Sequence, residues 1–259
     1  RGCRAVTLST LDWSILGPAT LAGLIVLATH VPLGREVLRR GIIFIDLAVA
    51  QIAGLGVIAT AAMGWEVHGF AAQLSAFVAA TMGALLLYAC ERRFKESQEA
   101  VIGVVFVLAA TGGILLLANN PRGGEELKDL LVGQILWVDA HTLWPAVLIS
   151  AFVLTTWSMG GRWVKGVGFY LLFALSVTVS VQLVGVFLVF ASLILPALAS
   201  RHARHGLATA YVVGGLGYAT GLLLSAIFDL PTGAVIVWCL TAWAVIIDLM
   251  LPHKSLSEV

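Results

Sequence analysis

Charged residues are scarce in this chain. Asp, Glu, Lys and Arg make up 11% of its 259 residues, whereas hydrophobic residues make up 60%. A soluble domain carries about 25% charged residues, so too little polar surface is available here to cover one water-exposed globule. The scarcity excludes a soluble domain and predicts an all-α protein, a polytopic bundle of transmembrane helices.

The chain has no excess of charge that would attract nucleic acid. The 15 Lys and Arg residues nearly balance the 14 Asp and Glu residues, giving a net charge of +1, and no basic stripe interleaved with aromatic residues occurs. Nucleic acid is therefore not an expected partner.

The three cysteines, Cys3, Cys90 and Cys239, lie far apart without a CxxC pair. This excludes a disulfide framework and a cysteine zinc site.

Motifs for nucleotide hydrolysis and covalent catalysis are also missing. The stretch GGRWVKG at 160–166 has the wrong spacing for the phosphate-binding loop G-x-x-x-x-G-K-[ST], which occurs nowhere in the chain. Neither G-x-S-x-G nor H-E-x-x-H occurs. We therefore expect a non-enzyme that binds no cofactor of its own. If ATP drives it, a partner subunit hydrolyses the ATP.

Long apolar runs are abundant. Segments of about 20 apolar residues, enough to cross a bilayer, alternate with short polar connections. The run at 168–200 is longer than one span needs, and Gln182 and Gly185 interrupt it, so we divide it there. The expected spans are residues 13–33, 41–63, 70–90, 100–118, 143–159, 167–181, 186–199, 207–228 and 232–251. Neither a linker nor a separate soluble domain is evident, so residues 1–259 are expected to form one transmembrane domain.

The distribution of Lys and Arg supports this division. With nine spans, every strongly basic connection falls on one side, which the positive-inside rule makes cytoplasmic. The N-terminus is then outside and the C-terminus in the cytoplasm. Without the division, Arg201 and Arg204 fall on the opposite side; eight spans with one re-entrant segment is the alternative. The longest outer connection, residues 119–142, is expected to carry an amphipathic piece at the membrane surface.

One stretch, LRRGIIFIDLAVAQIAGLG at 38–56, carries a charge into an apolar run. On a helix, Asp46, Ala50 and Gly54 share one face, and Gln51 lies next to it. A carboxylate deep in an apolar helix costs roughly 2.5–3.5 kcal/mol on insertion scales, so it faces protein or a water-filled path. Two interpretations stay open. This face lines a pathway, or it is a helix contact in which a neighbour satisfies Asp46.

Several stretches occur together in a familiar order. They are PLG at 32–34 with VLRR at 37–40, Asp46 at its spacing after the two arginines, Glu99-Ala100 with Gly103, LVGQIL at 131–136, VGVFLV at 184–189 with LPA at 195–197, and DLPTG at 229–233. This ordered set resembles the zinc/manganese/iron permease family, the membrane permeases of ATP-binding cassette (ABC) importers for divalent metals. No single motif carries the resemblance, but together the motifs cover most of the chain.

The resemblance implies a subunit of an importer in the bacterial cytoplasmic membrane. It implies three partners: a second copy of the permease, a separate ABC ATPase that binds ATP, and an extracytoplasmic metal-binding protein that delivers the ion. Asp46 would be the metal contact in the translocation path, with Gln51, Ala50 and Gly54 beside it. Gly185 and Pro196 would mark the bend of the seventh span, and Arg162, Lys165, Arg201 and Arg204 would face the ATPase.

The chain departs from the family pattern at two places. The family commonly has Asp-Ala-Leu-Ser-His, with Asp and His on one face, whereas this chain has Ala50 at the histidine position. The missing nitrogen ligand leaves the choice among zinc, manganese and iron open. The cytoplasmic segment that docks on the ATPase is also shorter, because only residues 160–166 separate the fifth and sixth spans. Residues 91–99 and 200–206 are candidates to share the coupling.

A function of another class is also open at this stage. A self-sufficient secondary transporter or channel could use Asp46 and Asp248 for proton or cation coupling. Such carriers often contain two corresponding broken helices in repeated halves. Only one broken run, at 182–196, is evident in this sequence, which favours the importer.

Overall fold

The computed structural model describes residues 13–63, 65, 70–118, 120, 123–133, 135–138, 140–161, 164 and 166–251. All regular secondary structure in these ranges is helical, which confirms the all-α prediction. The elements are α1 (Trp13–Arg40), α2 (Ile45–Ala62), α3 (Phe70–Arg93), α4 (Gln98–Leu117), α5 (Gly123–Val132), η2 (Ile135–Trp137), α6 (Ala140–Met159), α8 (Val167–Val184), α9 (Val186–Ala199), α10 (Gly206–Phe228) and α11 (Thr232–Met250).

The predicted division of the long apolar run is confirmed. Helix α8 ends at Val184 and α9 begins at Val186, on either side of Gly185. In the described part of the chain, 8 helices are long and apolar enough to cross a membrane, and α9 is a shorter apolar helix. Its 14 residues extend about 21 Å at 1.5 Å per residue, less than a bilayer core. The expectation of eight to nine spans therefore holds.

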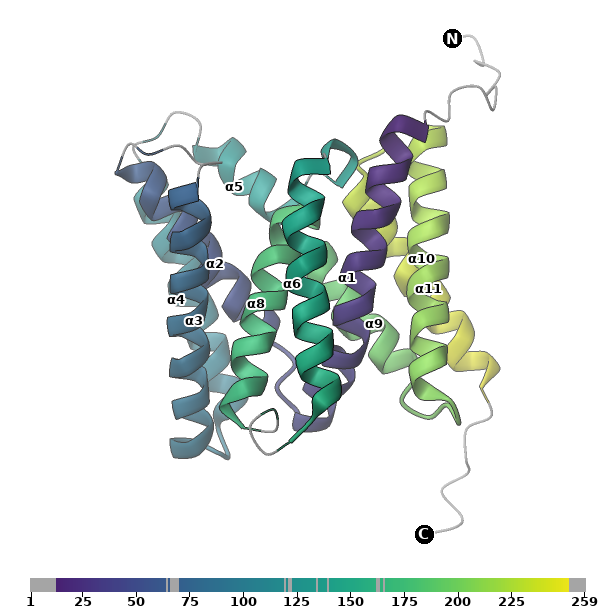
Figure 1. Cartoon of the computed structure of the whole chain (residues 1–259), viewed down its shortest axis with the longest axis horizontal. Helices are drawn as coiled ribbons and strands as arrows, with labels where there is room; N and C mark the ends of the chain where they lie inside the picture. Colours follow the sequence, from purple (N-terminus) through teal and green to yellow (C-terminus); the bar gives the residue numbers. More distant parts are fainter. Residues whose placement is uncertain are drawn as a thin grey trace.

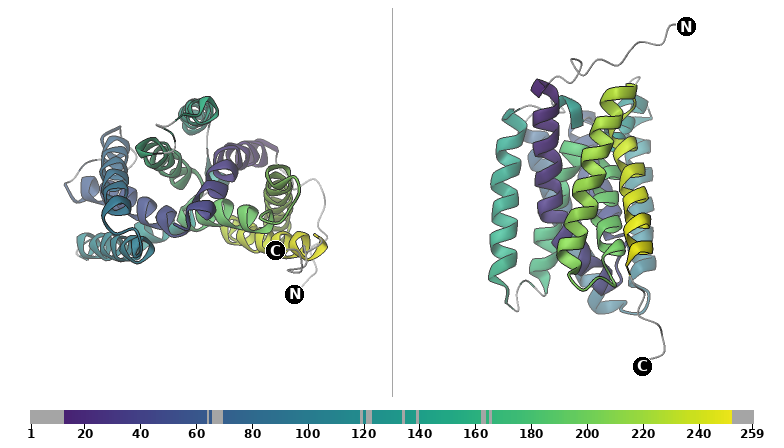
Figure 2. Two further views of the ribbon diagram at one scale, coloured as in Figure 1. Left: turned by 90° about the horizontal axis from the view of Figure 1, so that it is seen from below. Right: turned by 90° about the vertical axis from the view of Figure 1, so that its right-hand side faces the viewer.

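The bundle has two outer groups of helices and a central region. Helices α2, α3 and α4 pack together on one side, and α9, α10 and α11 pack together on the other. Helices α1, α6 and α8 lie between them, as the view from below in Figure 2 shows. Central α8 is the most buried of the membrane-length helices. Helix α2, which carries Asp46, therefore belongs to one outer group and also contacts α8 and α9.

Basic residues gather at one end of the bundle. The C-terminal ends of α1 and α3 and the turn between α9 and α10 all lie at the lower end in Figure 1. These segments carry Arg39, Arg40, Arg92, Arg93, Arg201 and Arg204. On the positive-inside rule this is the cytoplasmic end, and the opposite end is the outer end.

Helix α1 continues beyond the predicted end of the first span at Leu33. Glu36 accepts hydrogen bonds from Arg39 (3.1 Å) and Arg40 (2.9 Å), three and four residues along. Such pairs on one helix face stabilise its last turns. Gly41, with φ 69°, then ends the helix in a left-handed conformation that suits glycine. Residues 34–40, predicted to connect the first two spans, are helical because their charged residues pair with one another.

The outer connection differs from its prediction in one respect. It forms α5, as its amphipathic pattern indicates, and α5 slants from the outer end toward the middle of the bundle (Figure 1). The segment does not stay at the surface, however, because Ile135 of η2 is only 2% exposed and Leu130 and Leu131 pack against the core. A hydrophobic face of this kind can be covered by protein as well as by lipid.

Candidate functional site

Asp46 lies in the first turn of α2, and its side chain is fully buried, with 0% exposure. Neither carboxylate oxygen has a hydrogen-bond partner among the residues that the structure describes. The N-terminus of a helix favours negative charge, but an unpaired buried carboxylate is costly unless a cation or a proton compensates it. The carboxylate of Asp46 is therefore available to a cation that enters the protein.

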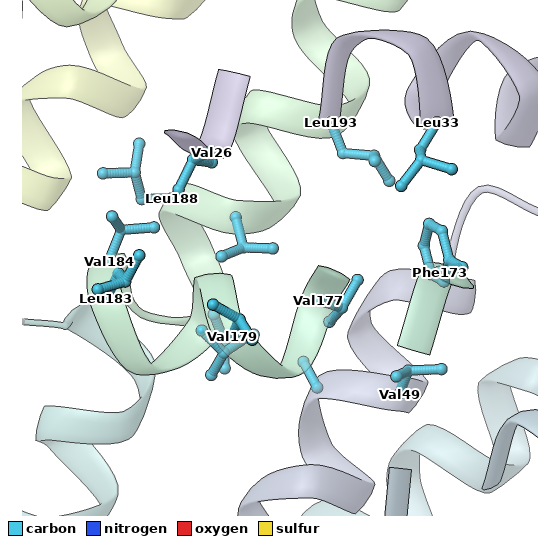
Figure 3. Close-up of a cluster of buried hydrophobic side chains, with 14 of the residues drawn as sticks. Val26, Leu33, Val49, Phe173, Val177, Val179, Leu183, Val184, Leu188 and Leu193 are labelled. Atoms are coloured by element: carbon cyan, nitrogen blue, oxygen red, sulfur yellow. The ribbon is translucent and has the colours of Figure 1, made fainter. Parts of the chain in front are cut away.

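The predicted α2 face is buried along its length. Ala50 and Gly54 follow Asp46 at four-residue intervals and are both buried, and the neighbouring Gln51 is buried as well. Val49, next to this face, lies beside α8 in the buried cluster of Figure 3. The prediction that Asp46 faces protein rather than lipid agrees with this arrangement. The packing interpretation requires a neighbour that forms a hydrogen bond or an ion pair with Asp46, and the described residues contain no hydrogen-bond partner for it.

Leu130 of α5 contacts this face at Gly54, near the middle of α2. Its Cδ2 atom is 2.5 Å from the position that a Cβ on Gly54 would occupy, so the missing side chain of Gly54 makes room for the leucine. Gly54 follows Asp46 by two helical turns, about 12 Å along α2 toward the outer end. At Gly54, the Asp46 face is therefore covered by a side chain from another helix.

Three of the stretches that carried the resemblance meet at the break between α8 and α9. Gly133 (φ 68°) and Gly185 (φ 80°) pack main chain against main chain, because a Cβ on either would overlap the backbone of the other segment. At the start of α11, a Cβ on Gly233 would lie 2.7 Å from the carbonyl oxygen of Val132. Only glycine combines a positive φ with such close approach. The end of α5 is thereby held against α8, α9 and α11.

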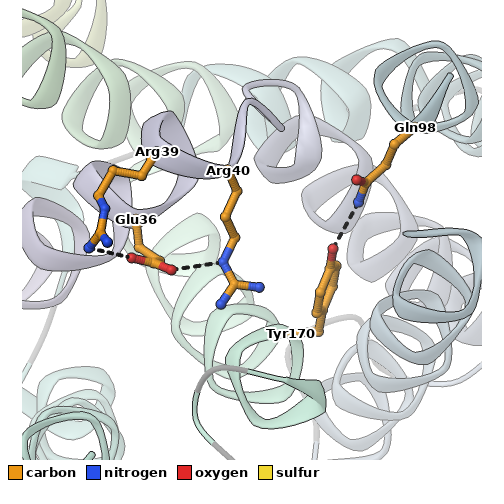
Figure 4. A network of polar contacts seen from close by, with 5 residues as sticks. All are labelled: Glu36, Arg39, Arg40, Gln98 and Tyr170. Carbon is orange, nitrogen blue, oxygen red and sulfur yellow. Dashed lines mark hydrogen bonds and ion pairs between the residues drawn. The ribbon is translucent and has the colours of Figure 1, made fainter. Parts of the chain in front are cut away.

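Polar and aromatic side chains join the helices at the cytoplasmic end (Figure 4). The guanidinium of Arg40 lies 4.1 Å from the ring centroid of buried Phe169 in α8, and its Nε donates a hydrogen bond to Glu36. Gln98 of α4 donates a hydrogen bond of 2.9 Å to the hydroxyl of Tyr170. These contacts tie α1, α4 and α8 together. Since the α2 carboxylate has no exposed surface, the face is closed at both ends in this conformation.

The structure places the remaining predicted residues as follows. Gly185 forms the predicted break, whereas Pro196 lies inside α9, where its carbonyl oxygen accepts a hydrogen bond from the Ser200 amide (3.2 Å). Arg201 and Arg204 are exposed in the turn between α9 and α10. Arg162 and Lys165 lie outside the described residues.

The two carboxylates of the secondary-transporter alternative are not brought together. Asp46 is in α2 and Asp248 in α11, and these helices lie on opposite sides of the bundle (Figure 1). In the described ranges, no group of three His, Cys, Asp or Glu side chains could hold a metal ion. In the part of the chain that the structure describes, Asp46 therefore does not belong to a cluster of three or more such side chains.

Sequence reasoning missed the contacts that close the site. Leu130 stood in a segment expected at the surface, and nothing in one sequence pairs it with Gly54 across 76 positions. The signal that could have helped is shared by three of the quoted stretches, each of which contains a glycine: Gly133, Gly185 and Gly233. Glycine in an apolar run often marks close backbone approach. Which glycines meet is a property of the tertiary fold.

Comparison with known proteins gives concordant matches. The family model described as "ABC 3 transport family" matches residues 12–165 and 161–251. The manganese transport system membrane protein MntC of Listeria monocytogenes is 25% identical over 95% of this chain and 94% of its own length. MntC of Halalkalibacterium halodurans is 26% identical over 88% of this chain and 84% of its own length. Both matches extend over nearly the whole of this chain.

A solved structure shows the same fold. The match is to PsaBC from Streptococcus pneumoniae in complex with Fab, with a TM-score of 0.73, 21% sequence identity, and coverage of 94% of this chain and 96% of that chain. At this level of identity the match concerns the fold alone. The arrangement of α1 to α11 is thus one that a solved protein also adopts.

Proposed function

The chain belongs to the ABC 3 transport family, and on this premise we propose that it carries a divalent metal ion inward as the permease subunit of an ABC importer. It is a multi-pass protein of the bacterial cytoplasmic membrane, and ATP is hydrolysed on a separate subunit. The observation that carries the proposed path is Asp46, a buried carboxylate for which the described residues provide no partner. A passing cation is the group that such a carboxylate can receive.

Manganese is the ion to test first. Ala50 leaves no imidazole one turn from Asp46, and carboxylate oxygens without nitrogen or sulfur suit harder cations such as Mn²⁺. The relatives from Listeria and Halalkalibacterium are named for manganese transport. One carboxylate also holds an ion weakly, and a path has to release its ion as well as bind it.

The partners follow from the family. The chain works in an ABC transporter complex, and we assign the ATPase contact to the cytoplasmic end, with Arg201, Arg204, Arg162 and Lys165. Exposure of Arg201 and Arg204 supports this assignment. We further propose that two copies of the permease pair, and that an extracytoplasmic metal-binding protein delivers the ion to the outer end.

The transport cycle requires the closed face to open at one end at a time. With both ends closed, Asp46 communicates with neither side of the membrane. ATP binding and hydrolysis on the partner would shift the population between outward-open and inward-open states. In the inward-open state, the contacts among α1, α4 and α8 at the cytoplasmic end would separate.

Replacing Asp46 by asparagine tests the path. Asp46→Asn keeps the size of the side chain but removes the negative charge that would attract the cation. We expect Mn²⁺ uptake by proteoliposomes that contain the permease and its ATPase to fall at least about tenfold, because a path carboxylate contributes charge that an amide does not replace. Size-exclusion chromatography checks that the variant still assembles.

Asp248→Asn is the matched control. It makes the same change in α11, on the other side of the bundle, and should leave uptake close to that of the unchanged protein. Wild-type uptake in the Asp46→Asn variant would contradict the path and favour the packing interpretation. Metal uptake by the purified chain without any ATPase would instead support the secondary transporter, with Asp248 again a candidate for the coupling.

A further inference from the structure

We propose that the last turns of α1, residues 33–40, act as a lever that transmits movement of the ATPase to α2, and that Arg35 is the positioning residue that holds this lever against the α9–α10 turn. This inference rests on the proposed function. It assigns a role to Arg35, which belongs neither to the stretches that carried the resemblance nor to the predicted ATPase contacts.

Pro32 gives α1 a hinge at the start of the lever. Proline has no backbone N–H, so inside a helix it leaves the carbonyl oxygen four residues earlier without its helical partner. For Pro32 that oxygen belongs to Ala28, and the hydroxyl of Tyr211 in α10 donates a hydrogen bond of 3.1 Å to it. A helix bends more easily where its own hydrogen bond is missing. Residues 33–40 can therefore move relative to the first part of α1.

Two successive residues of the lever contact both sides of the α9–α10 turn. A Cβ on Gly34 would overlap the carbonyl oxygen of Leu193 in α9. A Cβ on Gly206, the first residue of α10, would lie 2.9 Å from Nη2 and 3.3 Å from Cζ of Arg35. Arg35 is half-buried, and its guanidinium lies against the backbone of buried Gly206. Displacement of the turn therefore has to move the lever or break these close contacts.

The other end of the lever leads directly to the start of α2. Only residues 41–44 separate α1 from α2, whose first turn contains Asp46. The amide of Ile42 donates a hydrogen bond of 3.3 Å to the carbonyl oxygen of Val37, which ties this short connection back to the lever. The lever also carries the arginine that contacts the aromatic ring of α8 at the cytoplasmic end. Movement of the lever would therefore displace the start of α2 and separate that contact.

The lever gives the proposed cycle a physical route. ATP binding and hydrolysis would displace the turn at which we place the ATPase, the lever would follow through Arg35, and α2 would turn Asp46 toward the cytoplasmic side. Without Arg35, the ATPase would still bind the unchanged turn and hydrolyse ATP, but its movement would reach α2 less completely. Loss of Arg35 should therefore separate hydrolysis from transport.

Replacing Arg35 by alanine tests the contact. The Arg35→Ala permease is reconstituted with its ATPase in proteoliposomes, and Mn²⁺ uptake and ATP hydrolysis are measured on the same preparation. We expect the Mn²⁺ taken up per ATP hydrolysed to fall at least about fivefold, the lower end of the usual coupling between two sites. The ATPase should stay bound and active. A merely structural role of Arg35 would instead lower assembly, uptake and hydrolysis together.

Arg39→Ala is the matched control. Arg39 lies in the same lever, one turn after Arg35, but its side chain is 80% exposed and pairs with Glu36 of its own helix. The change removes the same kind of side chain without touching the α9–α10 turn. Mn²⁺ uptake per ATP should therefore equal that of the unchanged protein.

Gly206→Ala tests the same contact from the other side. The new Cβ would take space that the guanidinium of Arg35 occupies, so this variant should also lower Mn²⁺ uptake per ATP. In the Arg35→Ala background the same change should lose most of its effect, because residues in direct contact give non-additive changes.

Pro32→Ala tests the hinge. Alanine supplies the backbone N–H that proline lacks, so α1 should become stiffer at this point. We expect Mn²⁺ uptake to fall at least about fivefold while the thermal unfolding midpoint does not fall, because a stiffer hinge opposes movement and not folding. Pro18→Ala makes the same change near the outer end of α1 (Figure 1), outside the lever, and should leave uptake unchanged.

An unchanged ratio of Mn²⁺ to ATP in Arg35→Ala would overturn the lever. Equal losses of uptake and hydrolysis would do so as well, and so would additive effects of Arg35→Ala and Gly206→Ala. The Arg35 variants decide the question if Pro32→Ala does not fold. Failure of the proposed function has another signature, because the unchanged protein with its ATPase would then show no ATP-driven Mn²⁺ uptake at all.

Discussion

The absence of a side chain at Gly34 allows α1 and α9 to pack closely. A Cβ at this position in α1 would overlap the carbonyl oxygen of Leu193 in α9, and a backbone atom cannot rotate out of the way. Gly34→Ala should therefore separate the two helices and lower the free energy of unfolding by about 1–3 kcal/mol, the usual cost of overpacking. Thermal unfolding of the purified protein in detergent would show a lower midpoint.

Gly215→Ala controls for the intrinsic effect of alanine. Apart from its chain neighbours and the backbone of its own helix, no described residue lies within 4 Å of a Cβ at Gly215 in α10. Alanine is favoured over glycine in a helix by up to about 1 kcal/mol, so this variant should be neutral or more stable. The same loss of stability in both variants would contradict the close α1–α9 contact.

The burial of Asp46 could be predicted from the sequence, but its isolation could not. A carboxylate in an apolar run has to face protein, whatever the details of packing. Whether a cation on another helix pairs with it depends on which helices are neighbours. The structure shows α2 packed mainly on α3 and α4, with no described partner for the carboxylate. Tertiary arrangement, not local pattern, makes Asp46 a candidate ion contact.

At the scale of elements, the attachment of α5 can be tested separately from backbone strain. Gly133 has φ 68° and packs directly on the α8–α9 break. Gly160 has a nearly equal φ of 66°, and apart from its chain neighbours no described residue lies within 4 Å of its Cβ position. Alanine is strained at both positions, at a cost of about 1–3 kcal/mol. Only Gly133→Ala also forces two backbones apart, so it should lower the unfolding midpoint and the yield of folded protein further than Gly160→Ala. Equal effects would show that the contact contributes little.

The same elements show what sequence patterns can and cannot predict. The division at Gly185 was predictable because the apolar run is too long for one span and a polar and a glycine residue interrupt it. The inward slant of α5 was not, because an amphipathic helix can cover its apolar face with lipid or with protein. The continuation of α1 past residue 33, the predicted end of the first span, was not predictable from hydropathy, because the pairs of Glu36 with Arg39 and Arg40 stabilise the last turns.

At the scale of the whole molecule, the charge distribution is more informative than the net charge. The net charge is +1, yet the ends of α1 and α3 and the α9–α10 turn place arginines at one end. The positive-inside rule alone explains such a gathering as an orientation signal. If the ATPase contacts this end, some of these arginines should be needed for binding the ATPase subunit and others should not. That difference separates the two explanations.

Charge reversal in the α9–α10 turn tests the ATPase contact. Arg201→Glu with Arg204→Glu places repulsive charge where we assign the partner, and we expect the ATPase subunit to be retained at least about tenfold less well during purification, because reversed charge across an interface opposes docking. Arg92→Glu with Arg93→Glu makes the same change at the end of α3, where both arginines are also exposed. If only the first pair releases the ATPase while both insert normally, the turn is a specific contact. Equal release from both variants would assign the effect to the cytoplasmic end as a whole, including residues 91–99, the other candidate for the coupling, and would contradict a contact specific to the turn.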